Sequence, residues 1–181
     1  MKKKIAILGS TGSIGKTLIN IIKQDKKNFQ IVLLSADENY KELFKQAKFF
    51  KVKNLIITNE NSFNKVKKYR FSKKINIYNN FNNFRKIFKK KIDYTMSSIS
   101  GFNGLKPTLD IIKFTKTIAI ANKESIICGW NLINKQLKNH KTNFIPIDSE
   151  HFSIWSLIKN SPHEGIDKII ITASGGPFLN K

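Results

Sequence analysis

The chain has 181 residues, of which 40% are hydrophobic and 25% are charged, a balance typical of a soluble globular protein. Its 33 Lys and Arg residues against 12 Asp and Glu residues give a net charge of +21, which raises the hypothesis of nucleic-acid binding. The lysines are scattered through every segment, and arginine occurs only at Arg70 and Arg85. This distribution favours a solvated surface, and we expect no nucleic-acid partner.

Strand and helix patterns alternate along the first half of the chain. Short apolar or β-branched runs predict strands at 5–8, 29–34 and 55–58. Apolar residues at helical spacing predict helices at 14–22, 40–47 and 63–69, and the pattern repeats more weakly at 74–78 and 81–88.

The alternation continues in the second half. The predicted strands are 94–97, 117–121, 144–147 and 169–172, and the predicted helices are 104–114, 125–137 and 152–158. Repeated strand–helix units imply an α/β fold, with a parallel sheet covered by helices on both faces.

A glycine turn, GSTGSIG at residues 9–15, lies between the first predicted strand and the first predicted helix. Gly9 and Gly12 allow a tight bend and a close approach to a phosphate, and Gly15 allows the helix to pack closely. Backbone N–H groups at the helix start favour an anion, so the turn predicts dinucleotide binding without any lysine. The alternative is an ordinary glycine-rich connection, because the spacing is GxxGxxG and not the commoner GxGxxG.

The second strand is followed by Ser35-Ala36-Asp37-Glu38-Asn39. An acidic residue roughly 20 positions past a glycine turn suits a free ribose 2′-hydroxyl and would repel a 2′-phosphate. Asp37 and Glu38 could instead cap the helix that begins near Asn39. These two interpretations remain open at this point.

Three carboxylates, Glu124, Asp148 and Glu150, follow predicted strands, at the sheet edge where ligands bind. In extended backbone the side chains of Asp148 and Glu150 would point to one side and could bind Mg²⁺ or Mn²⁺. The alternative is a helix N-terminus capped by Asp148 or Ser149. Lys123, in ANKES, could contact a substrate oxygen, or could be one more solvated lysine.

The motifs ILGSTGSIG, ANKES, PIDSEH and ITASGGPF, in this order, resemble the amino-terminal half of the 1-deoxy-D-xylulose 5-phosphate reductoisomerase family. The resemblance runs through all 181 residues. It implies an NADPH-dependent enzyme of non-mevalonate isoprenoid synthesis. Such an enzyme rearranges 1-deoxy-D-xylulose 5-phosphate and reduces the product to 2-C-methyl-D-erythritol 4-phosphate.

The resemblance also implies roles for individual residues. The implied cofactor-binding residues are Thr11, Gly12, Ser13, Ile14, Asn39, Asn122 and Glu124. Lys123, Ser149 and Glu150 would hold the phosphorylated sugar substrate, and Ser174 would hold its phosphate. Asp148 and Glu150 would bind the divalent metal, and together with Lys123 they would be the catalytic residues.

The resemblance further implies two domains. Residues 1–147 would form a Rossmann-like NADPH-binding domain, and residues 148–181 the incomplete beginning of an α/β catalytic domain. We therefore expect a partial chain that binds cofactor, completes no active site alone, exposes apolar surface near its end, and belongs to a homodimer when full length. Many family members carry Gly or a basic residue where this chain has Asp37 and Glu38, which leaves the choice between NADPH and NADH open.

Other functions remain as alternatives. A non-catalytic dinucleotide-binding module and a basic nucleic-acid-binding protein are both compatible with parts of the pattern. An aspartate-semialdehyde dehydrogenase would need a nucleophilic cysteine in a loop, whereas Cys128 lies within a predicted helix. That lone cysteine excludes an intrachain disulfide, and no run of about 18 apolar residues predicts a membrane span. We therefore expect a cytoplasmic protein without a membrane partner.

Overall fold

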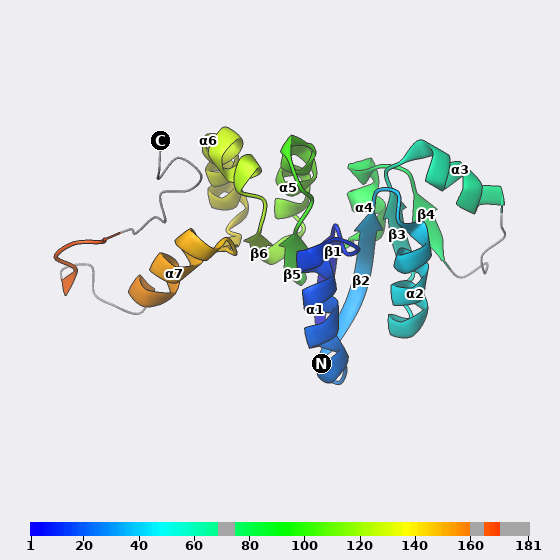
Figure 1. The fold of residues 1–181 in the computed structure, drawn as a ribbon, viewed down its shortest axis with the longest axis horizontal. Helices are drawn as coiled ribbons and strands as arrows, with labels where there is room; N and C mark the ends of the chain where they lie inside the picture. Colours follow the sequence, from blue (N-terminus) through cyan, green and yellow to red (C-terminus); the bar gives the residue numbers. More distant parts are fainter. Residues whose placement is uncertain (69–74, 160–164, 171–181) are drawn as a thin grey trace, which may run out of the picture.

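The computed structural model describes residues 1–68, 75–159 and 165–170 (Figure 1). Its first elements are β1 (Lys3–Leu8), α1 (Ser13–Gln24), β2 (Phe29–Ala36), α2 (Tyr40–Phe50), β3 (Asn54–Ile57), α3 (Glu60–Lys68), β4 (Asn76–Tyr78), the 3₁₀ turn η1 (Phe81–Asn83) and α4 (Phe84–Ile87). The later elements are β5 (Ile92–Ser97), the 3₁₀ turn η2 (Phe102–Gly104), α5 (Leu105–Ile112), β6 (Thr115–Ile120), α6 (Lys123–His140), β7 (Asn143–Pro146) and α7 (Ser149–Ile158). Among the described helices, none has the length and apolar character needed to cross a bilayer.

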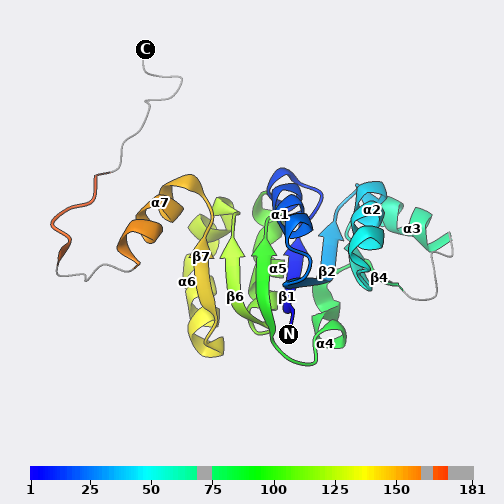
Figure 2. The ribbon, with the colours of Figure 1, turned by 90° about the horizontal axis from the view of Figure 1, so that it is seen from below.

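The strands form one sheet of seven in the order β4-β3-β2-β1-β5-β6-β7, and every neighbouring pair is parallel (Figure 2). From β1 the chain first builds the sheet outward through β2, β3 and β4, and then returns to place β5 on the other side of β1. The strand order therefore reverses between β1 and β5. In open parallel sheets, ligands bind beyond the carboxyl ends of the strands at such a reversal.

Side chains of β1 alternate between two hydrophobic cores, one on each face of the sheet. Ile5 and Ile7 pack with residues of α1 and α2, whereas Ala6 and Leu8 pack with residues of α4, α5 and α6. Figure 1 shows α1 and α2 on one side of the sheet and α5 and α6 on the other. Burial on both faces explains why the strand sequence is continuously apolar. The predicted Rossmann-like α/β fold is confirmed.

The end of the chain differs from the sequence prediction. A strand was expected at 169–172, but Ile169 and Ile170 have no strand structure, and residues 171 and 172 lie outside the described ranges. A strand requires a hydrogen-bonded neighbour. In the described part of the chain, β7 is the last strand of the sheet, and Ile169 and Ile170 do not pair with it. The helix α7 before this segment buries no residue, and the expected exposed apolar surface is present, with Phe152 41% exposed.

Candidate active site

The turn GSTGSIG joins β1 to α1 and is held by the end of β2. The Gly9 N–H donates to Ser35 Oγ at 2.9 Å, and the Ser10 N–H donates to the Ser35 carbonyl at 2.8 Å. Gly9 has a φ of +81°, and a Cβ there would lie 2.7 Å from the Ser98 carbonyl oxygen. A Cβ on Gly15 would lie 2.3 Å from the Gly9 carbonyl oxygen. Close packing of α1 thus depends on Gly15, as predicted. A side chain at position 15 would collide with the backbone of Gly9 and Ser10 in the turn.

Gly12 differs from the other two glycines of the turn. Its φ is −76°, and a Cβ there would have only the Gly9 carbonyl oxygen within 4 Å, at an ordinary 3.5 Å. Gly12 is the N-cap of α1, and no described side chain caps this helix by accepting a hydrogen bond from its first N–H groups. An uncapped helix N-terminus binds anions such as phosphate through its free N–H groups. The fold would tolerate a side chain at position 12. The absence of a side chain therefore leaves space beside the helix N-terminus for a ligand.

A cavity of about 850 Å³ opens beside the turn, at the strand reversal between β1 and β5. This volume lies within the range for small-molecule and cofactor sites. The cavity is lined by Gly9, Thr11, Gly12, Ser35, Ala36, Asp37, Thr58, Phe81, Ser98, Ile99, Ser100, Phe102, Asn103, Leu105, Lys106, Pro107 and Leu109. We call it the larger cavity.

The polar residues after β2 divide into a helix cap and a cavity residue. Asn39 is the N-cap of α2, and its Oδ1 accepts the Glu42 N–H at 3.2 Å. Asp37 lines the larger cavity, and its Oδ1 accepts a hydrogen bond from Thr58 Oγ1 at 2.7 Å. The interpretation of Asp37 as the cap of this helix is therefore wrong, because Asn39 fills that position. Asn39 does not line the larger cavity, and its contact with a cofactor stays a prediction.

A smaller cavity of about 410 Å³ adjoins the larger one, because residues 98–100 line both. Asn122, only 4% exposed, fixes this shared wall. Its amide donates to the carbonyl oxygens of Ile99 and Gly101, and its Oδ1 accepts the Ser125 N–H at 2.8 Å. These internal hydrogen bonds tie the loop after β5 to the start of α6, and a direct contact of Asn122 with a cofactor stays a prediction.

Most of the residues singled out in the sequence line one of the two cavities. Thr11 and Gly12 line the larger cavity. The smaller cavity is lined by Ile14, Asn122, Lys123, Glu124, Asp148, Ser149 and Glu150, together with residues 98–100, Ala121 and Ile147. Ser13, the first residue of α1, lines neither cavity. Ser174 lies outside the described residues.

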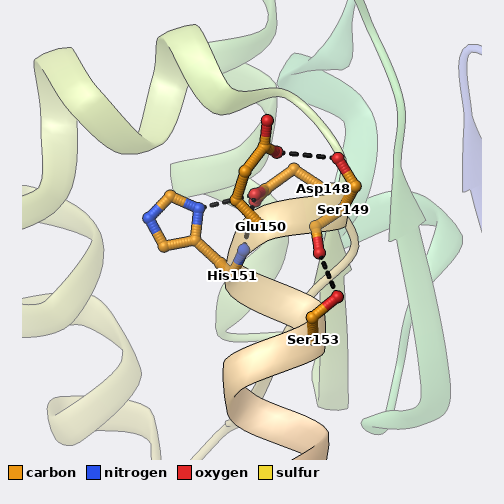
Figure 3. A network of polar contacts seen from close by, with 5 residues as sticks. All are labelled: Asp148, Ser149, Glu150, His151 and Ser153. Carbon is orange, nitrogen blue, oxygen red and sulfur yellow. Dashed lines mark hydrogen bonds and ion pairs between the residues drawn. The ribbon is translucent and has the colours of Figure 1, made fainter. Parts of the chain in front are cut away.

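The PIDSEH segment runs from the end of β7 into the start of α7, and the polar contacts of its last four residues are shown in Figure 3. Asp148 is the N-cap, and its Oδ1 accepts the His151 N–H at 3.0 Å and lies 2.6 Å from His151 Nδ1. The Ser149 hydroxyl donates to Glu150 Oε2 at 2.8 Å. Of the two interpretations of this segment, the helix N-terminus capped by Asp148 is therefore confirmed, and the extended backbone through Asp148 and Glu150 is wrong, because Ser149 and Glu150 are the first residues of a helix.

Both carboxylates have pKa values below their ordinary range. Burial raises the pKa of Asp148, but hydrogen bonds from the backbone and ring of His151 outweigh burial and lower it. A hydrogen bond from Ser149 lowers the pKa of Glu150, and the charge of Lys123 lowers it further. Both groups are therefore ionised at neutral pH, which is the state that binds a divalent cation.

The residues at the start of α7 fit a hard divalent metal. Asp148 Oδ2 is buried and has no hydrogen-bond partner within the described part of the chain. A buried oxygen without a partner is costly, and Mg²⁺ or Mn²⁺ would satisfy it. Glu150 lines the same cavity. No group of three His, Cys, Asp or Glu residues with metal-binding geometry occurs in the described ranges, so this pair would supply part of a coordination shell.

Sequence reasoning missed two parts of the site. Ser35, which holds the glycine turn, is 1% exposed and acts through a contact 26 residues away in sequence. The wall formed by residues 98–100 follows β5 directly. The polar run Ser97-Ser98-Ile99-Ser100 at the end of a predicted strand could have indicated this wall, by the same logic that singled out the other strand ends.

Comparisons with known proteins match both parts of the chain. The family model for 1-deoxy-D-xylulose 5-phosphate reductoisomerase matches residues 5–129, and the model for the C-terminal domain of this enzyme matches residues 144–181. The chain belongs to the 1-deoxy-D-xylulose 5-phosphate reductoisomerase family. It is 64% identical over 180 residues to the enzyme of this name from Pelagibacter ubique, a match that covers 98% of this chain and 46% of the relative.

Solved structures of reductoisomerases share the fold. The enzyme from Zymomonas mobilis in complex with NADPH superposes with a TM-score of 0.85 at 32% identity, covering 99% of this chain and 48% of that one. A reductoisomerase in complex with NADPH, fosmidomycin and magnesium gives a TM-score of 0.82 at 30% identity, covering 99% of this chain and 47% of that one. The chain thus spans about half the length of the reductoisomerases that it matches.

Proposed function

We propose that the protein takes part in the rearrangement and NADPH-dependent reduction of 1-deoxy-D-xylulose 5-phosphate to 2-C-methyl-D-erythritol 4-phosphate. Membership of the reductoisomerase family carries this proposal. The geometry supports it, because a glycine-turn cavity and a cavity with two ionised carboxylates share the wall formed by residues 98–100. A hydride donor in one cavity would therefore lie beside a substrate in the other.

The larger cavity would hold the cofactor. The uncapped start of α1 offers backbone N–H groups to the pyrophosphate, with Thr11, Gly12 and Ser13 around it. Ile14 lines the smaller cavity and would place an apolar surface near the reacting end of the cofactor. Asn122 and Glu124, at the start of α6, line the same cavity. These positions support the proposed cofactor-binding roles.

The smaller cavity would hold the metal and the substrate. Asp148 and Glu150 would be metal ligands, and the metal would supply electrophilic stabilisation of negative charge on substrate oxygens during the rearrangement. Lys123 would place its ammonium group beside these oxygens and add to that stabilisation. Ser149 would orient the substrate, and Ser174 would bind its phosphate. Remote binding of the phosphate would supply energy for positioning the reacting carbons.

We further propose that residues 1–147 act as the cofactor domain and that residues 148–181 begin the catalytic domain. The full-length protein would be a homodimer in the cytoplasm that binds a phosphorylated sugar and neither nucleic acid nor membrane. The scattered lysines support the absence of a nucleic-acid partner, and the lone Cys128 supports the cytoplasmic location.

The activity test uses a chimera, because the chain spans about half of its relatives. This chain would replace the matching segment of the Pelagibacter ubique enzyme, and NADPH oxidation would be followed with 1-deoxy-D-xylulose 5-phosphate and Mn²⁺. We expect activity close to that of the parent enzyme, and a loss of about 100-fold in the chimera with Glu150→Gln. A Cys128→Ser control should be fully active, since Cys128 is exposed on α6 and lines neither cavity. A folded but inactive chimera would contradict the proposal.

A second test separates cofactor binding from folding. Gly12→Val should lower the unfolding free energy of the 181-residue chain by no more than about 1 kcal/mol, because a Cβ there meets no atom closer than 3.5 Å and the remaining cost is that valine is a poorer N-cap than glycine. The same variant should abolish the fluorescence change of NADPH on binding, because the added methyl groups would occupy the phosphate position. Equal NADPH binding by both proteins would remove the glycine turn from the proposed site.

A further inference from the structure

One buried polar side chain of α2 faces the glycine turn. Gln46 is 4% exposed and shares the buried face of this helix with Leu43 and Ala47. Its Nε2 donates to the Ser10 carbonyl oxygen at 3.1 Å. Its Oε1 is buried and has no partner in the described part of the chain. Because a buried amide with an unpaired oxygen is costly, packing alone would favour an apolar side chain here, and the contact with Ser10 is what a glutamine adds.

Ser10 is held from two sides. Its N–H and its hydroxyl both donate to the Ser35 carbonyl of β2, at 2.8 and 3.2 Å. Among the described residues, only Gln46 donates to the Ser10 carbonyl. Ser10 is 0% exposed, so without Gln46 its carbonyl would be a buried acceptor with no donor. The peptide group between Ser10 and Thr11 would then lose the contact that fixes its plane.

This hydrogen bond sets the direction of the next N–H group. The described chain has no cis peptide bond, and in a trans peptide the carbonyl and the following N–H point to opposite sides. A Ser10 carbonyl directed at α2 therefore turns the Thr11 N–H away from α2. Thr11 lines the larger cavity, and no described group accepts its N–H. The Thr11 N–H is thus a free donor at the cavity, and Gln46 fixes its direction from the opposite side of the peptide.

We propose that Gln46 is a positioning residue of the dinucleotide site, which orients the Thr11 N–H toward a phosphate oxygen of the cofactor. This inference rests on the proposed function, in which the glycine turn binds the phosphates of NADPH. Gln46 lines neither cavity, so it acts through the Ser10–Thr11 peptide and not by contact with the cofactor. A hydrogen bond from a backbone N–H to an anionic phosphate oxygen is stronger than one between neutral groups, so its loss weakens binding measurably.

The experiment compares NADPH binding by the unaltered 181-residue chain and by three variants, measured by fluorescence titration. Gln46→Met keeps the length of the side chain and removes its donor, and Gln46→Leu removes the donor with a different shape. The matched control is Thr142→Val, which removes a buried hydroxyl that donates to the Ile112 carbonyl at 2.9 Å and lines neither cavity. Far-UV circular dichroism and the urea midpoint establish that each variant is folded.

Both Gln46 variants should raise the dissociation constant of NADPH about tenfold, as expected for loss of one hydrogen bond to a charged group. Thr142→Val should leave this constant unchanged, even where its urea midpoint falls as far. An unchanged dissociation constant in a folded Gln46 variant, or equal weakening by the control, would overturn the inference and leave the proposed function intact. Failure of the folded, unaltered chain to bind NADPH would refute the dinucleotide site itself, and the inference with it.

The Thr11 amide gives a readout that a loss of stability would not move. In the ¹⁵N-labelled unaltered chain, saturation with NADPH should shift the Thr11 amide proton downfield, as a new hydrogen bond to a phosphate oxygen requires. In Gln46→Met at saturation this shift should be much smaller, because the Thr11 N–H is no longer held in that direction. A bound cofactor that leaves the Thr11 amide of the unaltered chain unshifted would overturn the inference without any variant.

Discussion

The two ends of the candidate site are built in different ways. The glycine turn lies between buried strands, and its shape is set by backbone contacts of Gly9 and Gly15 and by the buried Ser35. The start of α7 depends on the half-buried cap Asp148 and on the exposed side chains of Ser149 and Glu150, and this helix buries none of its own residues. Both regions lie at the carboxyl edge of the same sheet.

This difference indicates how complete the glycine turn and the start of α7 each are as binding sites within the described chain. The backbone conformation of the turn is fixed by contacts within the described chain, because Gly9 and Gly15 pack closely against neighbouring backbone atoms and Ser35 accepts the Gly9 N–H. The start of α7 presents two ionised carboxylates, one with an unpartnered buried oxygen, and leaves most of the metal's coordination positions to other groups. A preformed candidate cofactor site thus lies beside part of a candidate metal site.

The largest difference between the two regions should appear in their tolerance of truncated apolar side chains. Ile22→Ala in α1 should cost about 3 kcal/mol of unfolding free energy, because Ile22 is 1% exposed and belongs to the core. Phe152→Ala in α7 should cost less than about 1 kcal/mol, since Phe152 is 41% exposed. Urea denaturation measures both, and similar costs would contradict the comparison.

Backbone crowding in the glycine turn gives the next effect. Gly15→Ala should cost about 2 kcal/mol and weaken cofactor binding, because the new Cβ would lie 2.3 Å from the Gly9 carbonyl oxygen. Gly12→Ala is the control, since a Cβ there has only the Gly9 carbonyl oxygen within 4 Å, at 3.5 Å, and the φ of −76° suits any residue, so this change should cost less than about 1 kcal/mol. If Gly15→Ala were the milder change, the turn would not be held by the contacts described.

The two tasks of Asp148 can be separated by two substitutions. Asp148→Asn should change stability by less than about 0.5 kcal/mol, because Asn is an equally good N-cap, whereas Asp148→Ala should cost about 1 kcal/mol. In the chimera with the Pelagibacter ubique enzyme, both variants should lose activity, because neither keeps an anionic metal ligand. Urea denaturation and NADPH oxidation measure the two effects, and an active Asp148→Asn chimera would exclude a metal role.

The smallest expected effect concerns Asp93, which lies near the amino end of β5 and accepts hydrogen bonds from Lys4 of β1 and Lys116 of β6. A hydrogen bond from Lys116, followed by one from the Lys4 N–H, lowers the pKa of Asp93 in the folded protein. Its contribution is therefore present above the unfolded pKa and is lost as the pH falls through the folded pKa. Asp93→Asn should cost less than about 1 kcal/mol at neutral pH, and the difference should vanish in acid, as urea titrations at several pH values would reveal. A cost that persists at low pH would assign Asp93 a role other than that of an ionised acceptor.

Local signals explain the features that could be predicted from the sequence. The apolar run of β1 and the glycines after it lie next to each other in the chain, so the strand, the turn and the helix could be placed from neighbouring residues. The anchoring role of Ser35 could not be predicted, because it arises only when β2 pairs with β1.

Competition between local signals explains why the sequence left two interpretations of the start of α7 open. Asp148 follows a strand and precedes an apolar segment with helical spacing, so the sequence around it fits both an extended pair of carboxylates and a helix cap. The cap prevails in the structure because the Asp148 carboxylate satisfies the His151 N–H at the helix start. Asn122 is a similar case, since its amide is used by loop carbonyls that only the folded chain brings near.

The most direct test of the account is an amide NMR titration of the ¹⁵N-labelled 181-residue chain with NADPH and with NADH. The account predicts that shifts concentrate at residues 9–15, at 35–39 and in the loop at 98–104, while the amides of α7 stay largely unchanged. Shifts spread over the lysine-bearing helix surfaces, with none in the glycine turn, would contradict the central claim that this turn and the end of β2 form the dinucleotide site.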